Sequence, residues 1–171
     1  MLSLEEEILR LGGALLIGFL IGIEREISKK PAGLRTHMLV SLASALFTIL
    51  SISPAFGGGA ADPTRIASQI LAGMGFIGAG VIISAGGHVI GVTTAASLWA
   101  TAAMGMAMGL GEYTLAFVSI GLVLVTLLFF RLIEGFLDQK EYREAFRRNP
   151  STEVLRKAHE YLRLTKGHGQ D

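Results

Sequence analysis

The sequence contains no cysteine, four prolines and one tryptophan, and only 17% of its 171 residues are charged. Without cysteine it has no disulfide framework, no thiolate metal site and no cysteine nucleophile. The low charged fraction accompanies 51% hydrophobic residues and a mean hydropathy of +0.54, a combination that does not suit a water-exposed surface. Because no Ser-His-Asp, HExxH or paired-carboxylate arrangement lies in the apolar segments, the sequence predicts that the protein is not an enzyme.

Charged residues are crowded into a few short stretches, with long uncharged runs between them. Residues 66–87, 89–111 and 113–130 contain no Asp, Glu, Lys or Arg, and each run is near or above the ~18 residues that favour a membrane-spanning helix. Two further apolar segments, 8–23 and 36–56, precede them. One such run could be a buried core helix, but five runs predict an all-α, polytopic membrane protein with five transmembrane helices in a glycine-rich bundle.

Turn residues and the first acidic cluster set the expected boundaries. Asp62-Pro63 is a helix start signal, and Gly86-Gly87-His88 is a turn between the third and fourth helices. Glu5, Glu6 and Glu7 stand where a secretory signal needs positive charge, so we expect the first helix to be retained. The predicted transmembrane domain covers residues 1–133, and residues 134–171 form a predicted cytoplasmic tail of amphipathic helices, the second starting at residue 149.

The positions of the basic residues predict the orientation. With five crossings, Arg10 and Arg65 lie on one side, and the other thirteen of the fifteen Lys and Arg residues lie on the opposite side. Since cytoplasmic loops retain Lys and Arg, the N-terminus is predicted to be outside and the C-terminal tail cytoplasmic.

A polar cluster is predicted at the cytoplasmic end of the first two helices. Its members are Glu24, Arg25, Glu26, Arg35 and His37. Ionisable groups that enter hydrocarbon cost a few kcal/mol each, so they pair or mark a site. Interface anchoring, a salt-bridge network and a binding site all remain open at this stage. Glu24, Glu26, His37 and His88 could together meet a divalent cation such as Mg²⁺, although their spacing is not diagnostic of a metal.

A second group of polar residues lies inside the apolar segments. We expect it to form an intramembrane polar face made of Arg65, Gln69, Thr93, Thr94, Ser97 and Thr101. Thr94, Ser97 and Thr101 are three to four residues apart and therefore share one side of a helix. Their hydroxyls could stabilise helix packing or line a pathway, and both interpretations remain open.

Glycines recur at helical spacing in three of the predicted helices. Residues 73–78 match G-x-G-x-x-G, but inside an apolar helix this pattern does not indicate nucleotide binding. Small residues instead let membrane helices approach closely, as in GxxxG pairs. The residues assigned to helix packing are Gly18, Gly22, Gly73, Gly75, Gly78, Gly80, Gly105 and Gly109. Packing within the bundle and packing between copies, as in a homodimer, both remain open.

Four stretches give the sequence a resemblance to the MgtC/SapB family of bacterial inner-membrane proteins: GFLIGIERE from residue 18, PAGLRT from 31, RIASQILAGMGFIGAG from 65 and GVTTAASLWA from 91. Glu24 and Arg25 match the family's E-R pair and Arg35 its G-L-R-T arginine. This chain has Thr93 and Ala100 where some members have Asn and Cys. About forty residues follow the fifth helix, too few for the folded cytoplasmic domain of larger members, so regulation through such a domain is not expected.

The resemblance implies a role in magnesium homeostasis and, in some pathogens, in virulence. It also implies a non-enzymatic regulator that binds another membrane complex, either ATP synthase or a P-type Mg²⁺ ATPase. The alternative is a small cation (Mg²⁺) transporter or channel subunit. We expect the lipid bilayer and a second copy of the chain as partners, and no nucleic acid. No cofactor is expected, and Mg²⁺ is the one ion left open.

Overall fold

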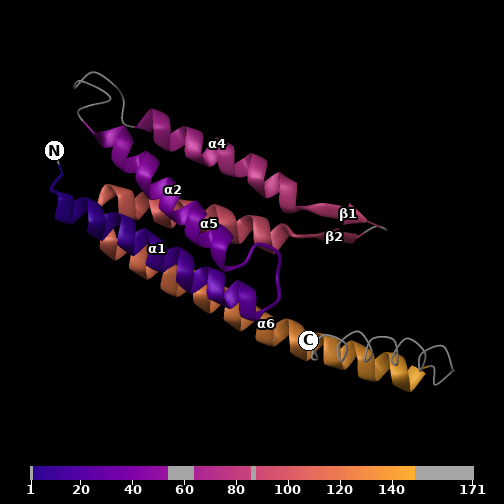
Figure 1. Ribbon diagram of the computed structural model, residues 1–171. Coiled ribbons are helices and arrows are strands. Elements are labelled where there is room, and N and C mark those ends of the chain that lie inside the picture. Colours follow the sequence, from indigo (N-terminus) through magenta and orange to yellow (C-terminus); the bar gives the residue numbers. More distant parts are fainter. Residues whose placement is uncertain (1, 54–63, 86–87, 149–171) are drawn as a thin grey trace, which may run out of the picture. The chain divides into compact units, whose positions relative to one another are not determined.

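The computed structural model describes residues 2–53, 64–85 and 88–148 (Figure 1). These ranges hold five helices: α1 (Leu4–Ile27), α2 (Leu34–Ile52), α4 (Thr64–Val81), α5 (Val92–Leu110) and α6 (Tyr113–Arg148). The predicted all-α class with five helices is therefore confirmed. Of the helices described, α2 is the one long and apolar enough to cross a membrane, while Ser68–Val81 and Tyr113–Phe129 are shorter apolar stretches.

The chain divides into two compact units, Met1–Val125 and Thr126–Asp171. Helix α6 begins in the first unit and is described to Arg148 in the second. The second predicted tail helix, from residue 149, lies outside the described residues. The first unit contains all the contacts discussed below.

Local sequence explains where several helices begin and end. Ser3 caps α1, because its hydroxyl accepts a hydrogen bond from the Glu6 backbone N–H at 3.2 Å. Gly111 ends α5 with φ of 84°, a left-handed conformation that a glycine adopts without a steric penalty.

The connection between α4 and α5 differs from the simple turn that the sequence predicted. Strands β1 (Ile83–Ala85) and β2 (His88–Ile90) pair in antiparallel fashion, with Ile83 opposite Ile90. Helix α4 ends at Val81, so the apolar run 66–87 is not one continuous helix. The physical reason is local: β-branched Ile and Val residues flank Gly86-Gly87, which is a hairpin sequence.

Helix α2 packs closely on both α1 and α5, which also contact each other, whereas α4 packs on α5 and, less extensively, on α2. Four glycines allow this approach. A Cβ added at Gly18 of α1 would lie 2.6 Å from the His37 carbonyl oxygen, and one at Gly22 would lie 2.7 Å from Leu34 Cα. On α5, a Cβ at Gly105 would collide with the Ser41 backbone, and one at Gly109 would lie 2.6 Å from the Ala45 carbonyl oxygen. These backbones are therefore in direct contact.

The glycines of α4 are in a different environment. Among the described residues, nothing lies within 4 Å of a Cβ added at Gly73, Gly75 or Gly80, and a Cβ at Gly78 would make an ordinary 3.6 Å contact with Ala95. Phe76 beside them is 85% exposed. Gly73, Gly75 and Gly80 therefore do not bring α4 close to another helix among the described residues.

A glycine packed against a neighbouring backbone and a glycine in open space give a matched test of the helix packing. Gly105→Ala should lower the free energy of unfolding by about 1–3 kcal/mol, because its methyl group overlaps the α2 backbone. Gly12→Ala on α1 should raise it by about 0.5–1 kcal/mol, because nothing described lies within 4 Å of a Cβ there and alanine favours a helix. Unfolding of the purified protein in detergent micelles measures both changes. Equal effects would contradict the proposed packing of α5 on α2.

Candidate functional site

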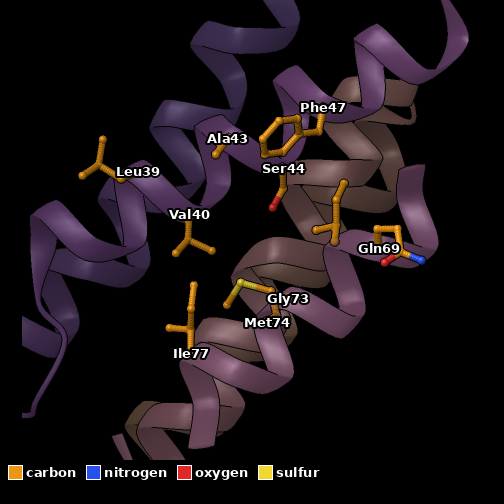
Figure 2. Close-up of a pocket in the computed structure, with 10 residues that line it drawn as sticks. Leu39, Val40, Ala43, Ser44, Phe47, Gln69, Gly73, Met74 and Ile77 are labelled. Atoms are coloured by element: carbon orange, nitrogen blue, oxygen red, sulfur yellow. The ribbon is translucent and has the colours of Figure 1, made fainter. Parts of the chain in front are cut away.

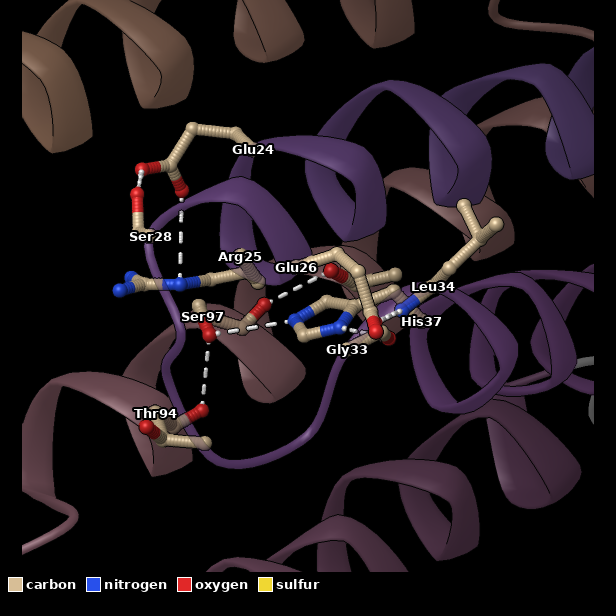
Figure 3. A network of polar contacts seen from close by, with 10 residues as sticks. Glu24, Arg25, Glu26, Ser28, Gly33, Leu34, His37, Thr94 and Ser97 are labelled. Atoms are coloured by element: carbon tan, nitrogen blue, oxygen red, sulfur yellow. Dashed lines mark hydrogen bonds and ion pairs between the residues drawn. The ribbon is translucent and has the colours of Figure 1, made fainter. Parts of the chain in front are cut away.

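The predicted polar cluster begins at the C-terminal end of α1, where two adjacent ionisable residues are buried. Glu24 is 7% exposed and Arg25 is 3% exposed. Glu24 Oε2 lies 3.4 Å from Arg25 Nε, and the Ser28 hydroxyl donates to Glu24 Oε1 at 2.6 Å (Figure 3). Within the described part of the chain, Arg25 Nε and Nη1 have no hydrogen-bond partner. Glu24 is thus the carboxylate that compensates the buried guanidinium.

His37 joins this cluster to α5. Its ring is fully buried, with Nδ1 3.0 Å from the Gly33 carbonyl oxygen and Nε2 3.2 Å from Ser97 Oγ. In the neutral ring the Nδ1 proton is donated to Gly33, so Nε2 accepts from Ser97. The same hydroxyl lies 2.8 Å from the Thr94 carbonyl oxygen (Figure 3). One Ser97 proton is therefore shared between two acceptors on different helices.

Buried hydroxyls continue from His37 along the contact between α2 and α5. On α2 they belong to Ser41, Ser44 and Thr48, and on α5 to Ser97 and Thr101. Thr48 donates to the Ser44 carbonyl and Thr101 to the Ser97 carbonyl, each at 2.7 Å. Because these protons go to carbonyls of their own helices, the two hydroxyls are satisfied within those helices.

The other predicted site residues lie outside this contact. Glu26 is exposed, and its Oε2 accepts from the Leu34 backbone N–H at 3.1 Å, which fixes the α1–α2 turn. Arg35, Gln69 and Thr93 are exposed. The Arg65 side chain lies outside the described residues. The structure therefore joins the two predicted groups through His37, which is bonded to Ser97 and so to Thr94 and Thr101. Glu24 and Arg25 pair with each other at the neighbouring end of α1.

A second polar network, not identified as a site from the sequence, lies at the opposite end of α1. Buried Arg10 donates from Nη1 to the Gly109 carbonyl at 2.7 Å and from Nη2 to Glu6 Oε1 at 3.0 Å. Tyr113 donates to the same Glu6 oxygen at 2.8 Å. These two donors, first Tyr113 and then Arg10, hold the pKa of Glu6 below its usual value. The i,i+4 spacing of Glu6 and Arg10 was a usable signal for their pairing.

A pocket of about 460 Å³ lies between α2 and α4. In Figure 2, Val40 of α2 faces Met74 and Ile77 of α4 across it. Ser44 and Gln69 are the polar residues of its lining, which otherwise consists of Leu39, Val40, Ala43, Phe47, Ile70, Gly73, Met74 and Ile77. Such a lining suits an apolar group, not a hydrated cation.

Within the described residues, no group of three or more His, Asp or Glu side chains is placed to hold a metal ion. The possible cation site that included Glu24, Glu26 and His37 is therefore not assembled in this part of the chain. The side chain of His88 lies outside the described residues.

Two neighbouring glutamates give a test of the buried pair. Glu24→Gln keeps the shape and an acceptor but removes the charge that compensates Arg25, so it should lower the free energy of unfolding by about 3–5 kcal/mol. Glu26→Gln, two residues away and exposed, should change it by less than about 0.5 kcal/mol. Thermal unfolding in detergent micelles compares them. A small, equal effect of both variants would mean that Glu24 does not stabilise Arg25.

The hydrogen bond between Ser97 on α5 and His37 on α2 can also be tested with a matched control variant. Ser97→Ala leaves His37 Nε2 buried without a donor and should cost about 1–3 kcal/mol. Thr93→Ala removes an exposed hydroxyl from the same helix and should cost less than about 0.5 kcal/mol. The ¹⁵N chemical shifts of the His37 ring should also move in Ser97→Ala alone. If those shifts stay the same, the ring nitrogen is not bonded to Ser97.

Three proteins show what this chain is similar to. It is 43% identical to Protein SapB of Bacillus subtilis over 128 residues, which are 71% of this chain and 55% of SapB. It is also 43% identical to "Putative magnesium transporter YhiD" of Escherichia coli K12 over 129 residues, covering 71% and 59% of the two chains. Identity to Protein MgtC of Brucella abortus is 38% over 146 residues, covering 85% and 60%.

The chain thus spans between 55% and 60% of the length of these relatives. No solved structure matches it significantly. The MgtC family model matches residues 11–136, which contain most of α1 and all of α2, α4 and α5. The match includes the polar cluster around Glu24 and His37 but, of the second network, only Gly109 and Tyr113. By this match and by its identity to SapB, YhiD and MgtC, the chain belongs to the MgtC family.

Proposed function

We propose that the protein is a multi-pass bacterial inner-membrane protein with its N-terminus outside and its C-terminus in the cytoplasm. Large apolar side chains are exposed on several helices of the first unit: Phe19 on α1, Phe76 on α4, Trp99 on α5 and Val118 on α6. Extensive exposed apolar surface is unfavourable in water but suits contact with acyl chains. Membership of the family and the distribution of Lys and Arg support the same topology.

Within that membrane we propose a non-enzymatic regulator linked to magnesium homeostasis. The observation that carries this choice is the packing of α2 on α1 and α5. Added Cβ atoms at Gly18, Gly22, Gly105 and Gly109 would meet backbone atoms of α2, so these contacts leave no room for a hydrated ion. The Thr48 and Thr101 hydroxyls are bonded to carbonyls of their own helices. The buried polar residues therefore fit a rigid framework better than a pathway.

The partner in this proposal is another membrane complex, either ATP synthase or a P-type Mg²⁺ ATPase. Arg35 is a suitable contact residue because it is exposed at the end of α2 that carries the polar cluster. A homodimer in the membrane plane is part of the same proposal. Its contact face would be the open glycine surface of α4, where Gly73, Gly75 and Gly80 allow close approach by a second helix.

A small Mg²⁺ transporter or channel subunit is the second candidate. It is favoured by the name of the E. coli relative. In this case the cation would pass elsewhere than between α1, α2 and α5, for example between two copies of the chain.

Purification in detergent-free polymer discs from bacterial membranes tests the first candidate. A partner complex should be recovered with the wild-type protein at fixed stoichiometry, and Arg35→Ala should reduce its recovery several-fold. Lys30→Ala, also an exposed basic residue beside the α1–α2 turn, is the matched control and should retain it. Intact-complex mass reports the number of copies.

Flux into proteoliposomes, followed with an enclosed Mg²⁺ indicator, separates the two candidates. The regulator should give no flux above protein-free vesicles. A saturable flux, together with a homo-oligomer free of other subunits, would replace the regulator with the transporter.

A further inference from the structure

The β1–β2 hairpin carries large aliphatic side chains that the rest of the described chain leaves uncovered. Ile83, Val89 and Ile90 are 60%, 61% and 58% exposed. Figure 1 shows the hairpin extending past the adjoining ends of α4 and α5. Ile82 and Val92, which flank it, are also exposed. This element therefore presents apolar surface to whatever surrounds it.

The strand register places this apolar surface on both faces of the hairpin. Ile83 pairs with Ile90, and Ser84 pairs with Val89. Since successive side chains of a strand point to opposite faces, Ile83 and Ile90 share one face and Val89 lies on the other. A docked protein would cover one face, whereas lipid would surround both.

The charge distribution favours phospholipid. Residues 66–111, which include the hairpin and most of both flanking helices, contain no Asp, Glu, Lys or Arg. Yet basic residues lie at the same end of the bundle, because the bond between His37 and Ser97 places the start of α2 beside the start of α5. These are Lys29, Lys30 and Arg35. Apolar side chains with basic residues nearby suit a surface of anionic headgroups.

The backbone limits how deeply the hairpin enters. A two-stranded sheet has two open edges with unpaired N–H and C=O groups. Each unpaired backbone group would cost several kcal/mol in the hydrocarbon core. At the interface, water and headgroups can form hydrogen bonds with these groups.

Gly91 fixes the base of the hairpin. It has φ of 95°, and a Cβ at this position would collide with the Val81 carbonyl oxygen. The end of α4 and the start of α5 are therefore held together through a residue that only glycine suits, which sets where the strands point.

We infer that the β1–β2 hairpin lies in the phospholipid headgroup region of the cytoplasmic leaflet, with Ile83 and Ile90 on one face and Val89 on the other in contact with lipid. This inference rests on the proposed membrane topology. It makes the hairpin a lateral anchor for α4 and α5 instead of a loop in the cytoplasm.

Because the chain has no cysteine, single-cysteine variants can be labelled with a nitroxide without background. The full chain would be reconstituted in phosphatidylethanolamine and phosphatidylglycerol vesicles as Val89→Cys, Ile90→Cys, Val118→Cys and Lys30→Cys. Collision of each label with oxygen, which partitions into lipid, and with a water-soluble nickel chelate gives its depth. Val118 is the lipid reference and Lys30 the water reference. Unchanged unfolding midpoints verify that the variants fold.

Labels at Val89 and Ile90 should both give depths between the two references, each with oxygen collisions several-fold above those at Lys30. Values like those of Lys30, with Val118 in lipid, would place the hairpin in water and overturn the inference while leaving the topology intact. Shielding of one label from both reagents would show that a protein covers that face, and would also overturn it. A water-like value at Val118 would instead reject the membrane proposal itself.

Discussion

The structure depends on one constraint, the direct backbone contact of α2 with α1 and α5. Four glycines create it, and any side chain at these positions would meet backbone atoms of α2. Backbones this close bring small polar side chains within hydrogen-bond distance, so the contact can be polar without containing water. In a bilayer, where apolar burial gives little driving force, such packing and hydrogen bonding supply the association energy.

The polar networks follow from that contact. His37 reaches Ser97 because the Gly18 and Gly105 contacts hold α2 against both neighbours. Arg25 is buried in the same region, so its charge needs Glu24 beside it. At the other end of α1, Arg10 donates to the Gly109 carbonyl in the last turn of α5. A buried arginine thus lies at each end of α1. Arg25 pairs with Glu24 of the same helix, and Arg10 bonds to Gly109 of α5.

Much of this fold follows from the sequence, because long uncharged runs have few alternatives to helices. Each run overlaps one of the five described helices, although α4 ends at Val81, before its run does, and α6 continues past its run to Arg148. Gly111 ends α5 as a glycine does. The hairpin was missed because strands of three residues lie within an apolar run and alter its hydropathy little. The sequence also does not show which face of each helix packs on a neighbour. Gly18, Gly22, Gly105 and Gly109 meet a neighbouring backbone, whereas Gly73, Gly75 and Gly80 of α4 face open space, and nothing in their spacing separates these cases.

The sequence identified the individual polar residues of the site, but it did not predict which of them are in contact. Glu24, Arg25, His37 and Ser97 were each recognisable as polar groups in apolar surroundings. His37 and Ser97 are connected by a hydrogen bond although they are 60 positions apart in the sequence, and local sequence patterns do not encode such a contact. Arg35 was grouped with them because it is near in sequence, yet it lies on the exposed side of α2. The hydroxyls of Ser41, Ser44 and Thr48 had the right spacing to be found, since they repeat every three to four residues after His37.

The bond from Arg10 to Gly109 also has a consequence for biosynthesis, because these residues are 99 positions apart. During translation α1 is made first, and α2 can pack on it as soon as it emerges. The carbonyl that Arg10 caps is made only when α5 is complete, and Tyr113 follows directly. Until then Arg10 can pair with Glu6 of its own helix but cannot bond to α5. The bond between α1 and α5 can therefore form only after α5 has been synthesised.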